Sequence, residues 1–161
     1  MTAAMETNST DAKEAVLQFI AAFHDAIATQ SPKKIEALLG SLILTERNKY
    51  WRNYEFPPIH LAGGAMITPG RIAMNGNRLE IFGNFKISGI CIIREDIMQQ
   101  YGQLPLTGWP KLGVPVSETN YTATFANSAI DFGFAEKNPD CLRTVGTSIL
   151  NPPPYPFGKP D

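Results

Sequence analysis

The chain has 161 residues, a length that predicts one domain with its own hydrophobic core. Apolar residues make up 43% and charged residues 18% of the chain, which is typical of folded globular proteins and argues against disorder. The formal net charge of −1 gives no electrostatic footprint for nucleic acid or for an anionic membrane surface. No apolar run is long enough to span a bilayer and no signal peptide is visible, so we expect a cytoplasmic protein.

Two helices are expected at the amino-terminal end. Residues 11–29 carry apolar side chains at helical spacing, which predicts the first helix. Ser31 and Pro32 are typical of an N-cap and a first helical turn, and Gly40 is typical of a helix end. The second helix is therefore predicted over residues 31–39.

The middle of the chain is expected to form the centre of the fold. Residues 85–93 are apolar on both faces of an extended chain, which predicts a central strand that is covered on both sides. A short helix is predicted from Arg94 to Tyr101, and Gly102 favours its termination.

From residue 59 onward the periodicity is two, which predicts short strands. Asn75-Gly76-Asn77 is typical of a hairpin turn, and Gly83-Asn84 is interpreted as another turn. Turns this short connect antiparallel strands. We therefore predict strands over these segments: 59–61, 66–67, 71–74, 78–82, 121–125, 130–134 and 142–149.

Together these elements predict an α+β fold, with two N-terminal helices and one short helix packed on an antiparallel meander sheet. Residues 1–150 form a single domain in this prediction. The segment 151–161 is a Pro-rich C-terminal tail, expected to be extended.

The two cysteines, Cys91 and Cys141, allow two interpretations. They are either two buried thiols in a reduced protein, or one bridge between the central strand and the start of the last strand. A bridge closing a loop of about 50 residues would stabilise the fold by about 4 kcal/mol on the chain-entropy model. A bridge would also favour the alternative of a periplasmic location.

The sequence carries little sign of reactive chemistry. Its two histidines, His24 and His60, lie at no ligand spacing from each other or from a cysteine, so no metal is expected. We interpret His24 as a boundary or core residue. Nucleophile motifs and phosphate-binding glycine loops are absent, so no catalytic residue or cofactor is assigned. Asp131 should face outward if its apolar neighbours face inward. Whether the protein is an enzyme stays open, with a non-catalytic role favoured.

An aromatic and basic cluster is the most informative feature for function. Residues 50–56 concentrate the side-chain types that dominate protein interfaces, and nearby cations could help docking. A further tryptophan lies in a loop rich in proline and glycine, where it is either a packing residue or an exposed anchor. The expected partner-binding residues are Arg47, Lys49, Tyr50, Trp51, Arg52, Tyr54 and Trp109.

The segments REDIMQQYG, NYTATF, AIDFGF and CLRTV, within residues 94–145, resemble the repeating unit of beta-lactamase-inhibitor-like proteins. By the same layout the whole chain is similar to bacterial immunity proteins, which neutralise a toxin. These resemblances imply a non-catalytic bacterial protein that occludes a partner toxin or enzyme. They imply a protein partner. Self-association is possible, and the charge and hydropathy of the chain give no expectation of a nucleic acid or a membrane as partner.

A competing resemblance is to the NTF2-like fold, in which two N-terminal helices pack into a curved sheet around a ligand pocket. The predicted helices 11–29 and 31–39 carry this resemblance. It implies a small-molecule-binding protein, or an enzyme of isomerase or dehydratase type. His60 and Asp131 would then be the residues to test.

Overall fold

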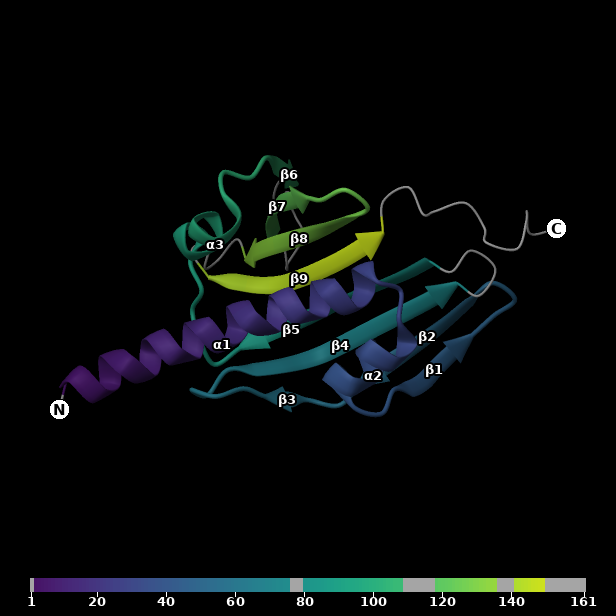
Figure 1. Cartoon of the computed structure of the whole chain (residues 1–161), viewed down its shortest axis with the longest axis horizontal. Helices are drawn as coiled ribbons and strands as arrows, with labels where there is room; N and C mark the ends of the chain where they lie inside the picture. Colours follow the sequence, from purple (N-terminus) through teal and green to yellow (C-terminus); the bar gives the residue numbers. More distant parts are fainter. Residues whose placement is uncertain (1, 76–79, 109–117, 136–140, 150–161) are drawn as a thin grey trace.

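The structure, a computed structural model, describes residues 2–75, 80–108, 118–135 and 141–149. These residues form three helices and a nine-stranded antiparallel sheet, so the predicted α+β class is confirmed (Figure 1). The helices are α1 (Thr2–Ala28), α2 (Pro32–Leu39) and α3 (Arg94–Tyr101). The strands are β1 (Ile43–Arg47), β2 (Trp51–Phe56), β3 (Ile59–His60), β4 (Met66–Asn75), β5 (Glu80–Ser88), β6 (Leu106–Gly108), β7 (Glu118–Thr124), β8 (Ser128–Ala135) and β9 (Leu142–Ile149).

The sheet consists of two meanders that meet in its middle. Its strand order is β1-β2-β4-β5-β9-β8-β7-β6, and the short strand β3 pairs with β4. The pairing of β5 with β9, in which Phe85 lies opposite Val145, joins the two meanders. The last strand of the chain therefore lies at the centre of the sheet, beside β5 (Figure 1).

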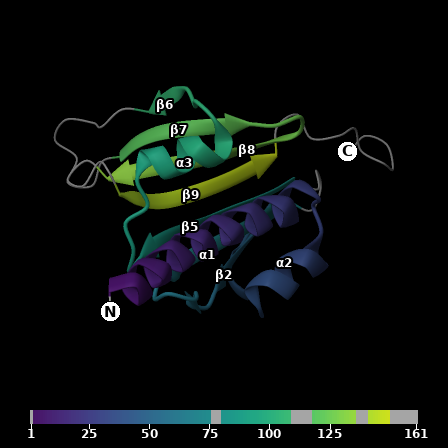
Figure 2. The same cartoon turned by 60° about the vertical axis from the view of Figure 1, so that its left-hand side comes forward.

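The three helices lie on one face of this sheet. Helix α1 runs along the middle of the sheet with α2 beside it, and α3 lies over β7 and β8 (Figures 1 and 2). Phe23 of α1 packs edge-on against Phe85, with ring centroids 4.8 Å apart, and Tyr101 of α3 lies 5.3 Å from Phe132. None of the described helices lies on the opposite side of the sheet, which we call the open face.

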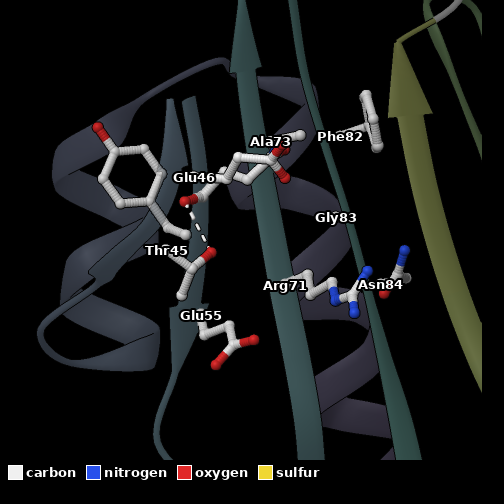
Figure 3. Close-up of a pocket in the computed structure, with 10 residues that line it drawn as sticks. Thr45, Glu46, Glu55, Arg71, Ala73, Phe82, Gly83 and Asn84 are labelled. Carbon is white, nitrogen blue, oxygen red and sulfur yellow. Dashed lines mark hydrogen bonds between the residues drawn. The ribbon is translucent and has the colours of Figure 1, made fainter. Parts of the chain in front are cut away.

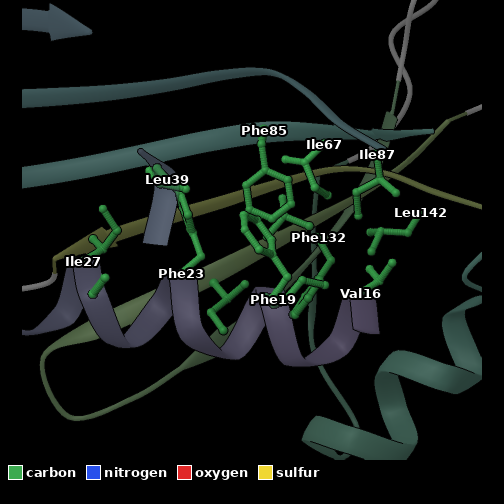
Figure 4. Packing of buried hydrophobic residues seen from close by; sticks show 14 of the residues in the cluster. Val16, Phe19, Phe23, Ile27, Leu39, Ile67, Phe85, Ile87, Phe132 and Leu142 are labelled. Carbon is green, nitrogen blue, oxygen red and sulfur yellow. The ribbon is translucent and has the colours of Figure 1, made fainter. Parts of the chain in front are cut away.

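Large apolar side chains fill the space between α1 and the sheet. Figure 4 shows Phe19 and Phe23 pointing from α1 towards Phe85 and Phe132 of the sheet. The ring of Phe19 lies 5.1 Å from that of Phe85 and packs edge-on against it. Phe132 is completely buried. Burying a side chain of this size contributes about 1.5–3 kcal/mol to folding, so the several rings at this interface contribute substantially to stability.

The helix boundaries agree with the sequence at two of the three helices. At α2 the Ser31 hydroxyl accepts a hydrogen bond from the Lys34 amide at 3.2 Å, as an N-cap does, and the predicted bounds of α3 are confirmed. At α3 the Asp96 carboxylate accepts a hydrogen bond from the Ile93 amide at 3.0 Å. Helix α1 begins at Thr2, so the predicted start at residue 11 is wrong.

Three predictions about the central strand are wrong. The described helices cover only one face of β5, where coverage of both faces was expected (Figures 1 and 2). Strand β5 continues through Gly83-Asn84, where a turn was expected. A Cβ atom at Gly83 would lie 2.7 Å from both Ile72 Cδ1 and Phe23 Cζ, so this glycine makes room for packing against α1. The strand also ends at Ser88, before residue 93. Gly89 has a φ of +82°, and a Cβ there would lie 2.5 Å from the Gly64 carbonyl oxygen, which explains the break.

Cys91 and Cys141 form a disulfide, which decides between the two interpretations of the cysteines. It joins the segment before α3 to the start of β9. The Leu142 amide donates a hydrogen bond of 2.7 Å to the Ile92 carbonyl directly beside it. No described helix is both long enough and apolar enough to cross a membrane. The predicted turn at 75–77, apart from Asn75, and the tail 151–161 lie outside the described residues.

Candidate functional site

The β1–β2 hairpin holds six of the seven expected partner-binding residues. Its loop is ordered by Asn48, whose Oδ1 accepts hydrogen bonds from the amides of Tyr50 at 2.8 Å and Trp51 at 2.7 Å. This is the local side-chain turn that asparagine favours. The seventh residue, Trp109, lies outside the described residues.

Three cations gather at the tip of this hairpin. Arg47 and Arg52 are direct cross-strand partners, and Lys49 lies in the loop between the two strands. All three are exposed, and none forms an ion pair with another described residue. The Lys49 ammonium lies 5.5 Å from the centre of the Tyr50 ring. Like charges placed opposite each other destabilise a strand pair, so Arg47 and Arg52 repel each other at the tip.

The aromatic residues of the hairpin do not form one surface. Trp51 lies on the open face, where its ring packs edge-on against Phe82 with centroids 5.3 Å apart. Ala73 of β4, the direct partner of Phe82, is too small to separate the two rings. Tyr54 is paired with Ile72 and faces the opposite side, where it packs against the core. The sequence predicted one aromatic cluster, and the structure divides it between the two faces of the sheet.

Described residues line two hollows on the open face. The hairpin hollow, of about 420 Å³, lies between β1 and β5 (Figure 3). Side chains that line it include Thr45, Glu46, Asn53, Glu55, Arg71 and Phe82. The central hollow, of about 480 Å³, lies between β4 and β7. Polar side chains that line it include Arg71, Asn84, Lys86, Glu118, Asn120 and Asp131.

Asp131 faces outward into the central hollow, as its position between two buried residues predicted. Its two carboxylate oxygens accept hydrogen bonds from Asn120 Nδ2 and Thr122 Oγ1, each at 3.2 Å. Desolvation raises the pKa of Asp131, and these two hydrogen bonds oppose that rise. The residue is still exposed at the mouth of the hollow, so solvent screens the effect.

A second carboxyl group in the central hollow comes from Glu118. Its Oε2 accepts a hydrogen bond of 2.9 Å from Thr144 Oγ1, so the side chain reaches from β7 across β8 to β9. Gly133 of β8 makes this possible, because a Cβ there would clash with Thr144 Oγ1 and lie 2.9 Å from Glu118 Cδ. Glu118 was not among the candidate site residues expected from the sequence. The pairing of β7 with β8 would have placed it on the face that carries Asp131.

The two histidines lie apart from this hollow. His24 of α1 hydrogen-bonds through Nε2 to Ser128 Oγ at 2.7 Å and stacks on Phe125 with centroids 4.4 Å apart, so it is a boundary residue as predicted. His60 is exposed on β3, which pairs only with β4, whereas Asp131 lies on β8. The two residues named for an NTF2-like pocket therefore do not share a hollow.

A third hollow, of about 520 Å³, lies beside the carboxyl end of α3. Tyr101, Leu104 and Phe125 contribute to its lining. The Tyr101 hydroxyl is buried and has no hydrogen-bond partner among the described residues, and burial raises the pKa of this phenol. The described residues include no group of three or more His, Cys, Asp or Glu side chains that could hold a metal ion.

Comparisons with protein-family models, with curated proteins and with solved structures find no match to this chain. The resemblances to inhibitor-like, immunity and NTF2-like proteins therefore remain predictions from the sequence. The geometry alone must indicate what the open face and the hairpin do.

Proposed function

We propose that this protein is a non-catalytic binding module that docks its β1–β2 hairpin on an acidic surface of a partner protein. The observation that carries the proposal is the cationic tip formed by Arg47, Lys49 and Arg52, which make no ion pair with another described residue. Its mode of action would be that of an inhibitor or immunity protein, which occludes a toxin or enzyme. We propose a bacterial source on the same resemblance.

The electrostatics of the tip support an acidic partner. Arg47 and Arg52 repel each other across the hairpin, and a carboxylate placed between them would turn that repulsion into attraction. Arginine also binds carboxylates through two parallel hydrogen bonds, which gives a docked surface a defined orientation. The protein as a whole has a net charge of −1, so the cationic tip would steer the encounter locally.

The aromatic side chains next to the tip supply apolar contact area. Tyr50 is 54% exposed and Phe82 is 40% exposed, and Trp51 packs against Phe82 on the open face. Tyrosine, tryptophan and arginine are the residues that contribute most to binding energy at protein interfaces. The hairpin end carries all three residue types, which supports a protein interface there, with the two arginines and Trp51 on opposite faces of the sheet.

The alternative proposal, a small-molecule-binding protein or enzyme of NTF2 type, has less support. Its pocket would lie between α1 and the sheet, where Phe19, Phe23 and Phe85 pack against one another. The polar hollows lie on the other face of the sheet. A ligand site there would not be the pocket that the resemblance implies.

The disulfide bears on the proposed compartment. Disulfides persist in oxidising environments, so we propose an oxidising compartment such as the periplasm over the cytoplasm expected from the amino terminus. Cys91 is exposed, so a reducing cytosol would have access to the bridge.

The proposed function can be tested by affinity capture from the native organism with three immobilised proteins. These are the wild type, the hairpin variant R47E/K49E and the control variant K33E/K34E, which reverses two exposed cations on α2. We expect one acidic protein to be retained by the wild type and the control, and lost from the hairpin variant. Its retention should fall as salt is raised towards 1 M. Equal retention by both variants would contradict the proposal.

Self-association is tested by the same proteins. Strand β1 is an edge strand, and its Ile43 and Leu44 are 59% and 47% exposed. Exposed apolar edge strands can pair with a second copy. If sedimentation shows a dimer that R47E/K49E dissociates, the partner of the hairpin is this chain itself and the proposal of a foreign acidic protein is wrong.

A further inference from the structure

One row of cross-strand partners crosses the centre of the open face. Arg71 of β4 is paired with Asn84 of β5, Asn84 with Gly146 of β9, and Gly146 with Asp131 of β8. Paired residues of an antiparallel sheet point to the same side, so these side chains share the central hollow. Figure 3 shows Arg71 and Asn84 directed towards each other from adjacent strands.

Charges of opposite sign occupy opposite sides of this hollow. Its cations are Arg71 on β4 and Lys86 on β5, and its carboxylates are Asp131 on β8 and Glu118 on β7. Neither cation forms an ion pair or a side-chain hydrogen bond with another described residue. The carboxylates are oriented by neutral donors, Asp131 by an amide and a hydroxyl and Glu118 by a hydroxyl. The two signs thus face each other without pairing.

A gap separates the two sides. Gly146 lies between Asn84 and Asp131 in the row, and a Cβ there would have no neighbour closer than the Gly83 carbonyl oxygen at 3.8 Å. The fold therefore has room for a side chain at this position. Gly133 lies on the neighbouring strand β8, two residues beyond Asp131. It differs because its Cβ would clash with Thr144 Oγ1. Packing explains Gly133, whereas the space above Gly146 remains open.

We propose that the central hollow binds a dipolar ligand of the α-amino acid class over Gly146. Arg71 and Lys86 would bind its carboxylate, and Asp131 with Glu118 would bind its ammonium group. The four charges of the hollow sum to zero, which matches a ligand without net charge. The volume of about 480 Å³ lies within the range of about 300–1,000 Å³ that is usual for small-molecule sites. This site is separate from the protein-binding hairpin and does not rest on the proposed function.

The desolvation at Asp131 is consistent with this assignment. Desolvation raises the pKa of Asp131, so its ionised form is incompletely compensated by its two neutral donors. An ammonium group in contact with the carboxylate would supply that compensation. Ligand binding should then lower the pKa of Asp131.

The experiment is isothermal titration calorimetry of the full chain with the twenty common L-α-amino acids, one at a time. Propionate and propylamine, which each carry one of the two charges, serve as matched probes. We expect at least one amino acid to bind with a Kd below about 1 mM. Both single-charge probes should bind at least tenfold more weakly. If no amino acid binds at this level, or if propionate binds equally well, the proposal is wrong.

Variants locate the binding in the hollow. Gly146→Val places a side chain in the gap, whereas Ser148→Val makes the same kind of change two residues along β9, at an exposed position on the same face. We expect at least tenfold weaker binding for G146V with an unchanged melting temperature, and unchanged binding for S148V. Arg71→Gln and Asp131→Asn should each weaken binding, and Lys33→Gln on α2 should not. Equal affinities for G146V and S148V would overturn the assignment.

The hairpin variant separates this proposal from the proposed function. R47E/K49E should bind the amino acid as the wild type does, even where it loses the partner protein. If amino acids fail to bind and G146V loses the captured partner, the hollow is part of a protein interface and the proposed ligand class is wrong.

Discussion

Arg47 and Arg52 face each other as direct partners across the β1–β2 hairpin, and neither forms an ion pair with another described residue. A strand pair of this kind is less stable than one with a neutral or acidic residue at either position. Proteins commonly retain such unfavourable arrangements where binding requires them. The pair is therefore the feature of the hairpin that folding alone does not explain.

Replacing one of these arginines should stabilise the protein. We expect Arg47→Gln to raise the free energy of unfolding by about 0.2–1 kcal/mol at low salt, because it removes a like-charge contact. The gain should shrink in 1 M salt, where the repulsion is screened. Urea unfolding at both salt concentrations measures it, with Lys33→Gln as the control. A loss of stability in R47Q would show that Arg47 makes a favourable contact.

The carboxyl of Asp131 should cost stability at neutral pH. Desolvation raises its pKa in the folded state above the unfolded value near 3.8, so the folded state binds the proton more tightly. This contribution to stability is present at low pH and is lost as the pH rises through the folded pKa. We expect Asp131→Asn to unfold at a slightly higher temperature than the wild type at pH 7, with the difference vanishing near pH 3. An unchanged or lower melting temperature at pH 7 would contradict this.

The pH dependence that His24 contributes should have the opposite sign, because stability is lost as the pH falls. Burial lowers its pKa in the folded state below the usual 6.5, and the nearby Asp25 carboxylate opposes this in part. Well above pH 6.5 the ring is neutral in both states and has no influence. As the pH falls from 6.5 to the folded pKa, the unfolded state takes up the proton first and stability is lost. We expect His24→Gln to remove this slope between pH 7 and pH 5, measured by urea unfolding.

The matched control for this titration is His60→Gln, since His60 is exposed on β3. It should keep the slope of the wild type. If H24Q keeps the slope and H60Q removes it, the assignment to His24 is wrong. Glutamine at position 24 retains a group that can hydrogen-bond to Ser128 Oγ, so the contact to β8 is not lost with the titration.

Local patterns in the sequence predicted the helices α2 and α3 and the strands β7, β8 and β9, but they did not predict the strands β1, β2 and β6. The alternation of Ile130, Asp131 and Phe132 fixed which side of β8 is buried, because side chains of a strand alternate. The cap at Ser31 fixed the start of α2 in the same local way. The turn predicted at Gly83-Asn84 is wrong. The glycine is needed there for the packing of α1, which is a tertiary contact that local sequence patterns do not reveal.

The central hollow could not be predicted for a related reason. Its residues come from five strands, and the alternation along each strand says which face a residue occupies without saying which strand lies next to it. The decisive pairing is that of β5 with β9, between residues about sixty positions apart. Only this pairing brings Asn84 beside Gly146, and so Arg71 and Asp131 onto opposite sides of one gap.

The buried Tyr101 hydroxyl should reduce the stability of the folded protein. It is buried without a hydrogen-bond partner among the described residues, while its ring packs against Phe125 and Phe132. Removing a buried unsatisfied hydroxyl avoids a desolvation penalty of about 1–3 kcal/mol. We expect Tyr101→Phe to be stabilised by about 1 kcal/mol in urea unfolding. A loss of similar size would show that the hydroxyl has a partner in solution.

The disulfide between Cys91 and Cys141 should be a large part of the total stability. It spans 50 positions of the chain, and closing a loop of this length contributes about 4 kcal/mol on the chain-entropy model. Domains of this kind are typically stable by about 5–15 kcal/mol, so its loss leaves a marginal fold. We expect C91S/C141S to lose about 4 kcal/mol in urea unfolding.

Reduction provides an independent measurement of the same bridge. Cys91 is exposed, so a reductant can reach the bridge in the folded protein. The reduced wild type should match C91S/C141S, and reductant should leave the double variant unchanged. If the reduced wild type is as stable as the oxidised form, the bridge does not constrain the unfolded chain. The packing of Ile92 and Leu142 beside it, joined by a backbone hydrogen bond, would then hold this junction by itself.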